Sequence, residues 1–283
     1  MARGIALNIG LNAVDSRHYR DEDGKPWKGT LLACENDARD MAALATEMGF
    51  DLAGPLLTKV ATSTKVLSEA RAAAKALAPG DSFLLTYSGH GGQVENTNPD
   101  DDPEEDRLDE TWCLYDRELL DDELFALFSE FEPGVRIVVL SDSCHSGTVT
   151  RAAPGRRTRG AGGAGAEDDV RPKQLPMDVA IATENAHAQL YAKLQKEIPS
   201  KRLTSVGATV VLISGCQDDQ FSNDGRENGV FTGALLKAWK EDPAARRSLK
   251  GLWESTSAGI DARYGQTPNY SIYAFDVGPA LAI

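Results

Sequence analysis

The strongest constraint on the fold of this chain is a regular alternation between short apolar runs and longer segments with helical periodicity. The apolar runs, each of four to six residues, lie at 5–9, 56–60, 83–87, 135–140 and 210–213. The helical patterns between them lie at 35–48, 65–77, 121–131 and 231–240. Strands that alternate with helices form a mostly parallel sheet with helices on both faces. We therefore expect an α/β fold.

Composition narrows the range of functions. The 283 residues are 41% hydrophobic, enough to fill a core, and carry a net charge of −13. This charge repels phosphate backbones and anionic lipids, so we expect neither nucleic acid nor membrane as a partner. The four cysteines have no metal or disulfide spacing, and the run at 5–9 is too short for a signal sequence. We expect a cytoplasmic protein with free thiols.

Two polar clusters follow buried runs directly. The run at 83–87 leads into Ser-Gly-His-Gly-Gly at 88–92, and the run at 135–140 leads into Ser-Asp-Ser-Cys-His-Ser-Gly at 141–147. Because the carboxyl ends of parallel strands meet at one edge of a sheet, both clusters should lie at the same edge. By contrast, no glycine-rich phosphate loop follows the first run, and we expect no organic cofactor.

The two clusters supply the parts of a nucleophilic site. An imidazole beside a thiol can take its proton and later protonate the leaving amine. We predict that Cys144 is the nucleophile and His90 its general base. The backbone amides of Gly91 and Cys144 are the expected donors of an oxyanion hole. Taken singly, each residue is more simply a buried thiol or a core histidine, but the matched contexts favour catalysis.

These motifs carry a family resemblance. The segments 87–93 and 142–147 resemble the two catalytic motifs of the metacaspases and related orthocaspases, caspase-like cysteine peptidases of the peptidase C14 type. Further segments resemble family landmarks in the same order: 36–38, 109–111, 121–123 and 214–220. The resemblance therefore covers nearly the whole chain.

The resemblance implies a caspase-like (caspase–hemoglobinase) fold, with a mostly parallel sheet of about six strands sandwiched by helices. We expect residues 1–150 to form a large catalytic region and 151–205 a flexible linker with basic sites and a helix. Residues 206–283 would form a small C-terminal region that completes the same sheet, within one caspase-like domain overall. The resemblance also implies a monomer, and because the chain begins almost at its first strand we expect no N-terminal prodomain.

Cleavage after Arg or Lys is a further implication of the resemblance. Asp142 lies two residues before Cys144, where its carboxylate can bind a guanidinium through paired hydrogen bonds. The alternative role of Asp142 is to cap a turn. By resemblance, Asp37, Ser88 and Asp218 join Asp142 in the pocket.

A strongly acidic segment raises the question of calcium, which often activates this family. Residues 95–123 hold 14 acidic and 2 basic residues. By resemblance, Asp109, Asp121 and Asp122 are candidate calcium ligands. Arg151 stands where the family has a fourth carboxylate, which places calcium dependence in doubt; the alternative is a solvated acidic loop.

The segment 151–173 is rich in Gly and Ala and cannot bury enough apolar surface to order itself. We expect it to be a mobile, protease-accessible linker that the enzyme cuts itself. The candidate sites for self-cleavage share a basic side chain: Arg151, Arg156, Arg157, Arg159, Arg171 and Lys173.

The sequence thus predicts a cysteine endopeptidase that cuts protein or peptide substrates after Arg or Lys. Two alternatives stay open: a caspase-like hydrolase with another primary specificity, and an inactive caspase-like module that serves as a binding scaffold. The retention of both Cys144 and His90 argues against the scaffold.

Overall fold

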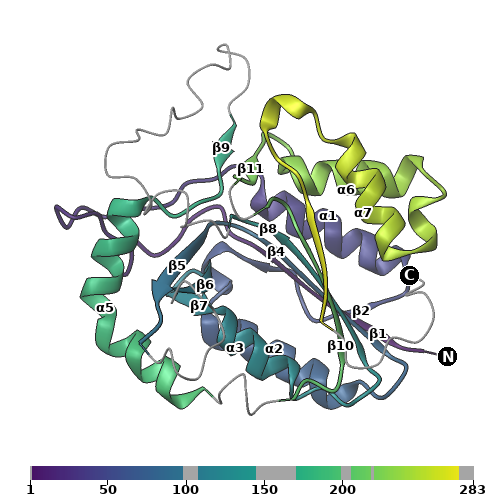
Figure 1. The fold of residues 1–283 in the computed structure, drawn as a ribbon, viewed down its shortest axis with the longest axis horizontal. Helices are drawn as coiled ribbons and strands as arrows, with labels where there is room; N and C mark the ends of the chain where they lie inside the picture. Colours follow the sequence, from purple (N-terminus) through teal and green to yellow (C-terminus); the bar gives the residue numbers. More distant parts are fainter. Residues whose placement is uncertain (1, 98–107, 145–169, 199–204, 218–219, 274–283) are drawn as a thin grey trace.

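The computed structural model describes residues 2–97, 108–144, 170–198, 205–217 and 220–273. Its centre is a sheet of seven strands in the order β12-β10-β8-β4-β1-β2, with β3 also paired to β1 (Figure 1). The strands are β1 (Gly4–Gly10), β2 (Asp51–Leu52), β3 (Leu56–Leu57), β4 (Ser82–Ser88), β8 (Arg136–Asp142), β10 (Thr209–Ser214) and β12 (Asn269–Tyr273). Only β12 runs antiparallel to its neighbour within this sheet. The expected α/β fold is confirmed, with one strand more than the sequence suggested.

Helices cover both faces of the sheet (Figure 1). One layer holds α1 (Cys34–Glu47), α6 (Val230–Glu241) and α7 (Leu249–Gly259), and the other holds α2 (Ser63–Ala76) and α3 (Asp121–Phe128). Alternate residues of β1 serve the two layers: Leu7 and Ile9 lie in the core under α2 and α3, whereas Ala6 lies in the core under α1 and α6. A strand buried on both faces needs apolar residues at nearly every position, which explains the continuous runs in the sequence.

Smaller elements lie beside the main sheet. A second, antiparallel sheet contains β5 (Gly91–Glu95), β6 (Leu108–Cys113) and β7 (Glu118–Leu120). The long helix α5 (Met177–Glu197) packs against β5, and β9 (Arg171–Pro172) pairs with β11 (Asn223–Asp224). Three short 3-10 helices lie at Thr58–Val60, Ala245–Arg247 and Ala262–Tyr264. No helix in the described part of the chain is long and apolar enough to cross a membrane.

The C-terminal end of the predicted linker differs from the expectation. Residues 171 and 172 form β9, and Lys173 is 0% exposed instead of accessible. The prediction of a mobile stretch up to Lys173 is therefore wrong at this end. The composition of the segment does not show that one of its charged side chains binds partners in the folded protein. Those partners define the candidate site.

Candidate active site

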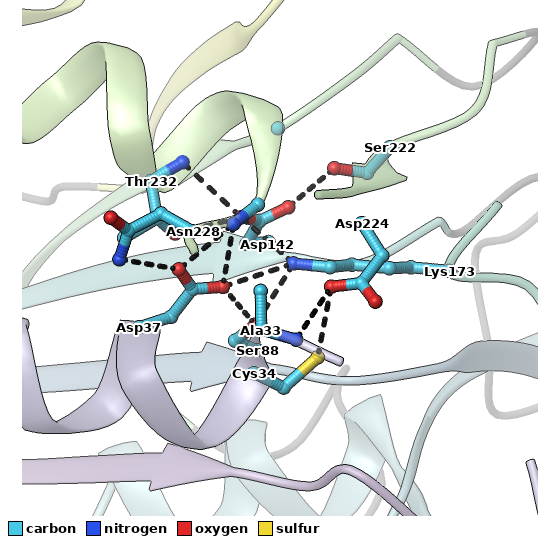
Figure 2. Close-up of polar contacts among 12 residues, drawn as sticks. Ala33, Cys34, Asp37, Ser88, Asp142, Lys173, Ser222, Asp224, Asn228 and Thr232 are labelled. Atoms are coloured by element: carbon cyan, nitrogen blue, oxygen red, sulfur yellow. Dashed lines mark hydrogen bonds and ion pairs between the residues drawn. The ribbon is translucent and has the colours of Figure 1, made fainter. Parts of the chain in front are cut away.

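The predicted site residues come together at the carboxyl edge of the main sheet. Ser88 ends β4, Asp142 ends β8, and His90 and Cys144 follow these strands within two residues. Because β4 and β8 are adjacent and parallel, with Ser88 opposite Asp142, both polar clusters emerge side by side. Asp37 reaches the same point from α1 (Figure 2). One short region thus gathers the predicted nucleophile, the predicted base and three of the four predicted pocket residues.

A lysine of the same chain fills the predicted pocket. The ammonium nitrogen Nζ of Lys173 lies 3.0 Å from Asp142 Oδ2, 3.2 Å from Asp37 Oδ2 and 2.9 Å from Ser88 Oγ (Figure 2). Three acceptors match the three hydrogens of an ammonium group. Asp142 and Asp37 therefore contact a buried cation, and neither serves merely as a cap.

The charge of Lys173 is compensated inside the protein. Its side chain is 0% exposed, and burial alone would lower its pKa. The carboxylates of Asp142 and Asp37 oppose that effect and raise the pKa of Lys173 well above its ordinary value. The pocket therefore holds the lysine in its charged form.

The start of α6 supports both carboxylates. The backbone N–H of Gly229 donates to Asp37 Oδ1 at 2.9 Å, and the hydroxyl of Thr232 donates to Asp142 Oδ2 at 2.7 Å. Ser222 donates to Asp142 Oδ1 at 2.5 Å. Both carboxylates thus accept hydrogen bonds from the start of α6, where the free N–H groups of a helix favour negative charge.

Gly229, Thr232 and Ser222 were missed by the sequence analysis. A Cβ atom on Gly229 would lie 2.3 Å from Lys173 Nζ and 2.4 Å from Asp142 Oδ2, so only glycine leaves room for the bound side chain. A signal was available: Gly229 directly precedes an apolar helical pattern, where free N–H groups bind anions.

The backbone of Lys173 is also held at the site. Its carbonyl oxygen accepts hydrogen bonds from the N–H groups of Gly91 and Cys144, each 3.1 Å long. Its own N–H donates to the carbonyl of Ser222 at 2.8 Å, and the N–H of Leu175 donates to the carbonyl of Gly91 at 2.8 Å. The chain therefore crosses the site in extended form. The two amides predicted to form an oxyanion hole point at one carbonyl oxygen.

His90 is buried beside this extended segment. Its Nε2 lies 3.1 Å from the carbonyl oxygen of Gly29, and Nδ1 has no hydrogen-bond partner among the described residues. A carbonyl oxygen only accepts, so Nε2 carries the proton and Nδ1 has a lone pair. Burial lowers the pKa of His90 to about 4, against the opposing effect of the backbone of Gly29 and Gln174. The ring is therefore neutral at pH 7.

Cys144 is buried as well. Burial, and next the neighbouring thiol of Cys216, raise its pKa well above the ordinary value, while the backbone of Ser222 acts in the opposite sense. The N–H of Ser222 donates to its Sγ at 3.0 Å. Within the described residues, no hydrogen bond joins the Cys144 thiol to the His90 ring. The site in this state therefore combines a neutral thiol with a neutral imidazole.

The candidate calcium ligands also converge. One carboxylate oxygen each of Asp109, Asp121 and Asp122 lies within 4.8 Å of the other two. The amides of Asn96 and Gln195 each donate to Asp109 at 2.8 Å. Clustered carboxylate oxygens are typical ligands of a hard cation such as calcium. Calcium takes six to eight oxygen ligands, which is more than one oxygen from each of these three residues.

Several predictions fall on residues outside the described part of the chain, and their placement is not tested. These are the pocket residue Asp218 and the self-cleavage candidates Arg151, Arg156, Arg157 and Arg159. The remaining cysteines, Cys34, Cys113 and Cys216, are buried free thiols.

Comparisons with known proteins agree with this architecture. The Caspase domain family (Peptidase_C14) matches residues 3–274. Metacaspase-1 from Kluyveromyces lactis is 29% identical and Metacaspase-1 from Saccharomyces cerevisiae 28%; each match covers 95% of this chain and 66% of the relative. The chain thus spans just under two thirds of the length of these relatives.

Among solved structures, protein GSU0716 from Geobacter sulfurreducens is 44% identical, with a TM-score of 0.81, covering 97% of this chain and 95% of that one. Caspase-1 from Spodoptera frugiperda shares the fold at 10% identity, with a TM-score of 0.55 and coverage of 99% and 89%.

Proposed function

The chain belongs to the caspase-domain family (Peptidase_C14), and from that premise we propose that it is a cysteine endopeptidase that cuts after Lys or Arg and first cuts itself after Lys173. The observation that carries this proposal is the pose of Lys173. Its ammonium lies between Asp37 and Asp142 while its carbonyl oxygen receives the N–H groups of Gly91 and Cys144. A residue held in this way is bound as the residue before a scissile bond.

The reaction follows from the positions of the polar groups. Nδ1 of His90 takes the thiol proton of Cys144, and Sγ attacks the carbonyl carbon of Lys173. The negative charge that develops on the carbonyl oxygen is stabilised by the two amides already directed at it. When the bond to Gln174 breaks, its nitrogen takes the proton from His90 and a thioester is left on Cys144. A water molecule, deprotonated by His90, then hydrolyses the thioester and restores the thiol.

The filled pocket also supports a resting state. While Lys173 occupies the pocket, an external substrate has no access to Asp37 and Asp142. Burial keeps the thiol and the imidazole neutral in this state, as the directions of their pKa shifts indicate. Cleavage after Lys173 would free the segment to leave, so self-processing is proposed as the step that opens the site to other substrates.

The direct test is to incubate the purified chain and map new termini by mass spectrometry. We expect a new N-terminus at Gln174, its loss in Lys173→Met, and its retention in Lys173→Arg. Cys144→Ala and His90→Ala should each slow the cut at least about a thousandfold. Cleavage after Asp168 or Asp169 would overturn the Lys/Arg preference, and an uncut chain with no activity on Lys peptides would favour a binding scaffold.

Calcium enters as a further proposal. Asp109, Asp121 and Asp122 would hold the ion, and it would supply positive charge that relieves repulsion among three carboxylates. Gln195, whose amide donates to Asp109, belongs to α5, the helix that follows the segment cut in this proposal. Ion binding at this cluster would then act, through α5, on the segment that carries Lys173.

A further inference from the structure

The segment that crosses the site has a second buried side chain beyond the bond at Lys173. Going from Pro172 to Leu175, exposure alternates: Pro172 is exposed, Lys173 buried, Gln174 half-buried and Leu175 buried. This alternation is typical of an extended chain, in which every second side chain points to the same side. Lys173 and Leu175 therefore both point into the protein, one on each side of the bond.

Gly91 fixes this register through the main chain. Its N–H donates to the carbonyl of Lys173 at 3.1 Å and its carbonyl accepts the N–H of Leu175 at 2.8 Å, so that Gly91 pairs with Gln174 as in a parallel ladder. Main-chain hydrogen bonds do not depend on side-chain identity. Any peptide that uses the Gly91 N–H as an oxyanion donor and keeps this pairing must place its second residue after the cut where Leu175 now lies.

The surroundings of Leu175 are mostly apolar, with the buried polar side chains of Glu118 and Thr111 close by, beside Gly92. Leu175 is 3% exposed and packs in a cluster with Val14, Tyr19 and Cys113 of the protein body. Gly92 leaves room for it, since a Cβ there would lie 3.2 Å from Leu175 Cδ2. The remaining buried member of the cluster, Val179, belongs to α5, and the other three, Val14, Tyr19 and Cys113, form most of the pocket wall.

We propose that this cluster is a substrate subsite: the enzyme prefers peptides with Lys or Arg before the cut and a large aliphatic residue at the second position after it. The inference rests on the proposed function and adds a selective position to it. Pro172 is exposed, so the residue before the basic one should be tolerated broadly. A carboxylate at the second position would lose its hydration beside the buried side chain of Glu118.

The experiment uses the self-cleaved wild-type enzyme with internally quenched peptides of the form Arg-Pro-Lys-Gln-X-Pro, in which X is Leu, Ala or Asp. We expect kcat/KM to fall from Leu to Ala to Asp, with at least about a tenfold difference between Leu and Asp. Replacing the Pro before Lys by Ala should change the rate by less than about threefold, because that side chain is exposed. Equal rates for Leu and Asp, within twofold, would overturn the subsite.

A pocket variant gives a second readout that does not depend on how much enzyme folds. In Val14→Lys, the ratio of the Leu rate to the Asp rate should shrink, because an ammonium then lines the subsite. In Val60→Lys, at an exposed position, the ratio should stay at the wild-type value. An unchanged ratio in Val14→Lys would contradict the proposal. If no peptide is cut after Lys, the proposed function itself fails and the subsite with it.

Discussion

Two groups of aspartates in this protein have different electrostatic surroundings. Asp37 and Asp142 lie on either side of the Lys173 ammonium, at 3.2 and 3.0 Å, and also accept N–H and O–H groups from the start of α6 and from Ser222. The other group is the cluster of Asp109, Asp121 and Asp122, whose carboxylate oxygens lie within 4.8 Å of one another. The side-chain amides of Asn96 and Gln195 donate hydrogen bonds to Asp109.

The difference shows how each group should respond to its environment. In the first group, the cation belongs to the chain, and the proposed cut after Lys173 would be the change that lets it leave the pocket. In the second, a cation from solution would reduce repulsion at short range. We therefore expect the first group to respond to changes in the chain and the second to respond to the ions in the buffer. The following predictions test this contrast.

The largest effect is expected from removing one carboxylate of the filled pocket. In the Cys144→Ala chain, which cannot cut itself, Asp142→Ala should lower the free energy of unfolding by about 3–5 kcal/mol, because it leaves a buried ammonium less compensated. Adding Lys173→Met removes that ammonium and should restore much of the lost stability. Urea unfolding of Cys144→Ala alone, with each substitution and with both measures the coupling between Asp142 and Lys173. Additive effects of the two substitutions would show that the ion pair is not the stabilising contact.

A somewhat smaller effect is expected from pH. Burial lowers the pKa of His90 to about 4, whereas a histidine in an unfolded chain titrates near 6.5. Between these values the unfolded chain binds more protons, so the unfolding free energy should fall as pH drops from about 6.5 to about 4, by about 3 kcal/mol from His90.

The contribution of His90 can be separated from that of other groups. His18, whose pKa is also lowered to about 4, chiefly by burial and next by His187, lies at another site and should contribute in the same direction. Urea unfolding of Cys144→Ala at several pH values, beside the same chain with His90→Asn or His18→Asn, compares them. If His90→Asn leaves the pH dependence of unfolding unchanged, the His90 ring is not shielded from water in the folded protein.

Gly229 tests the shape of the pocket. In Gly229→Ala, the new Cβ would meet Lys173 Nζ and Asp142 Oδ2, so kcat/KM on Lys peptides should fall about a hundredfold and stability by about 1–3 kcal/mol. Gly233→Ala is the matched control within α6, where the Cβ has its nearest neighbour at 3.4 Å and alanine favours the helix. Equal activity in both variants would mean that the pocket can widen.

The smallest effect is expected at the acidic cluster. Calcium at about ten times its dissociation constant should stabilise the Cys144→Ala chain by about 1.4 kcal/mol, seen as a rise of about 2 °C in Tm. Asp121→Asn or Asp122→Asn should reduce the rise, whereas Asp51→Asn, at an exposed ion pair with Arg3, should not. An unchanged Tm up to millimolar calcium would leave the cluster as a solvated acidic group, and the contrast between the two groups would fail.

Much of the fold could be predicted from the sequence because strands buried on both faces leave continuous apolar runs. The runs at 83–87 and 135–140 match β4 and β8 closely, and the polar residues after them reach one edge. The antiparallel strands β5 to β7 were missed, because such short strands depend on register with their partners more than on local pattern.

The filled pocket could not be predicted in the same way. Arg171 and Lys173 belong to a segment whose composition predicts disorder, and their order comes from contacts distant in sequence. Lys173 contacts Asp37, Ser88 and Asp142, and Arg171 donates to the carbonyl of Thr30. Individual basic residues in a linker carry no local signal of which one a folded pocket will select. The sequence analysis named Lys173 as one of six candidates, and only tertiary structure separates it from the others.

The pairing of β8 with β10 has a consequence for how the cut protein would behave. Six registered residue pairs join these strands, from Arg136 with Thr209 to Ser141 with Ser214. Cutting between Lys173 and Gln174 would leave β8 on one polypeptide and β10 on the other, within the interior of one sheet. A denaturing gel would then resolve two bands, whereas gel filtration in native buffer would give one peak at the mass of the uncut chain.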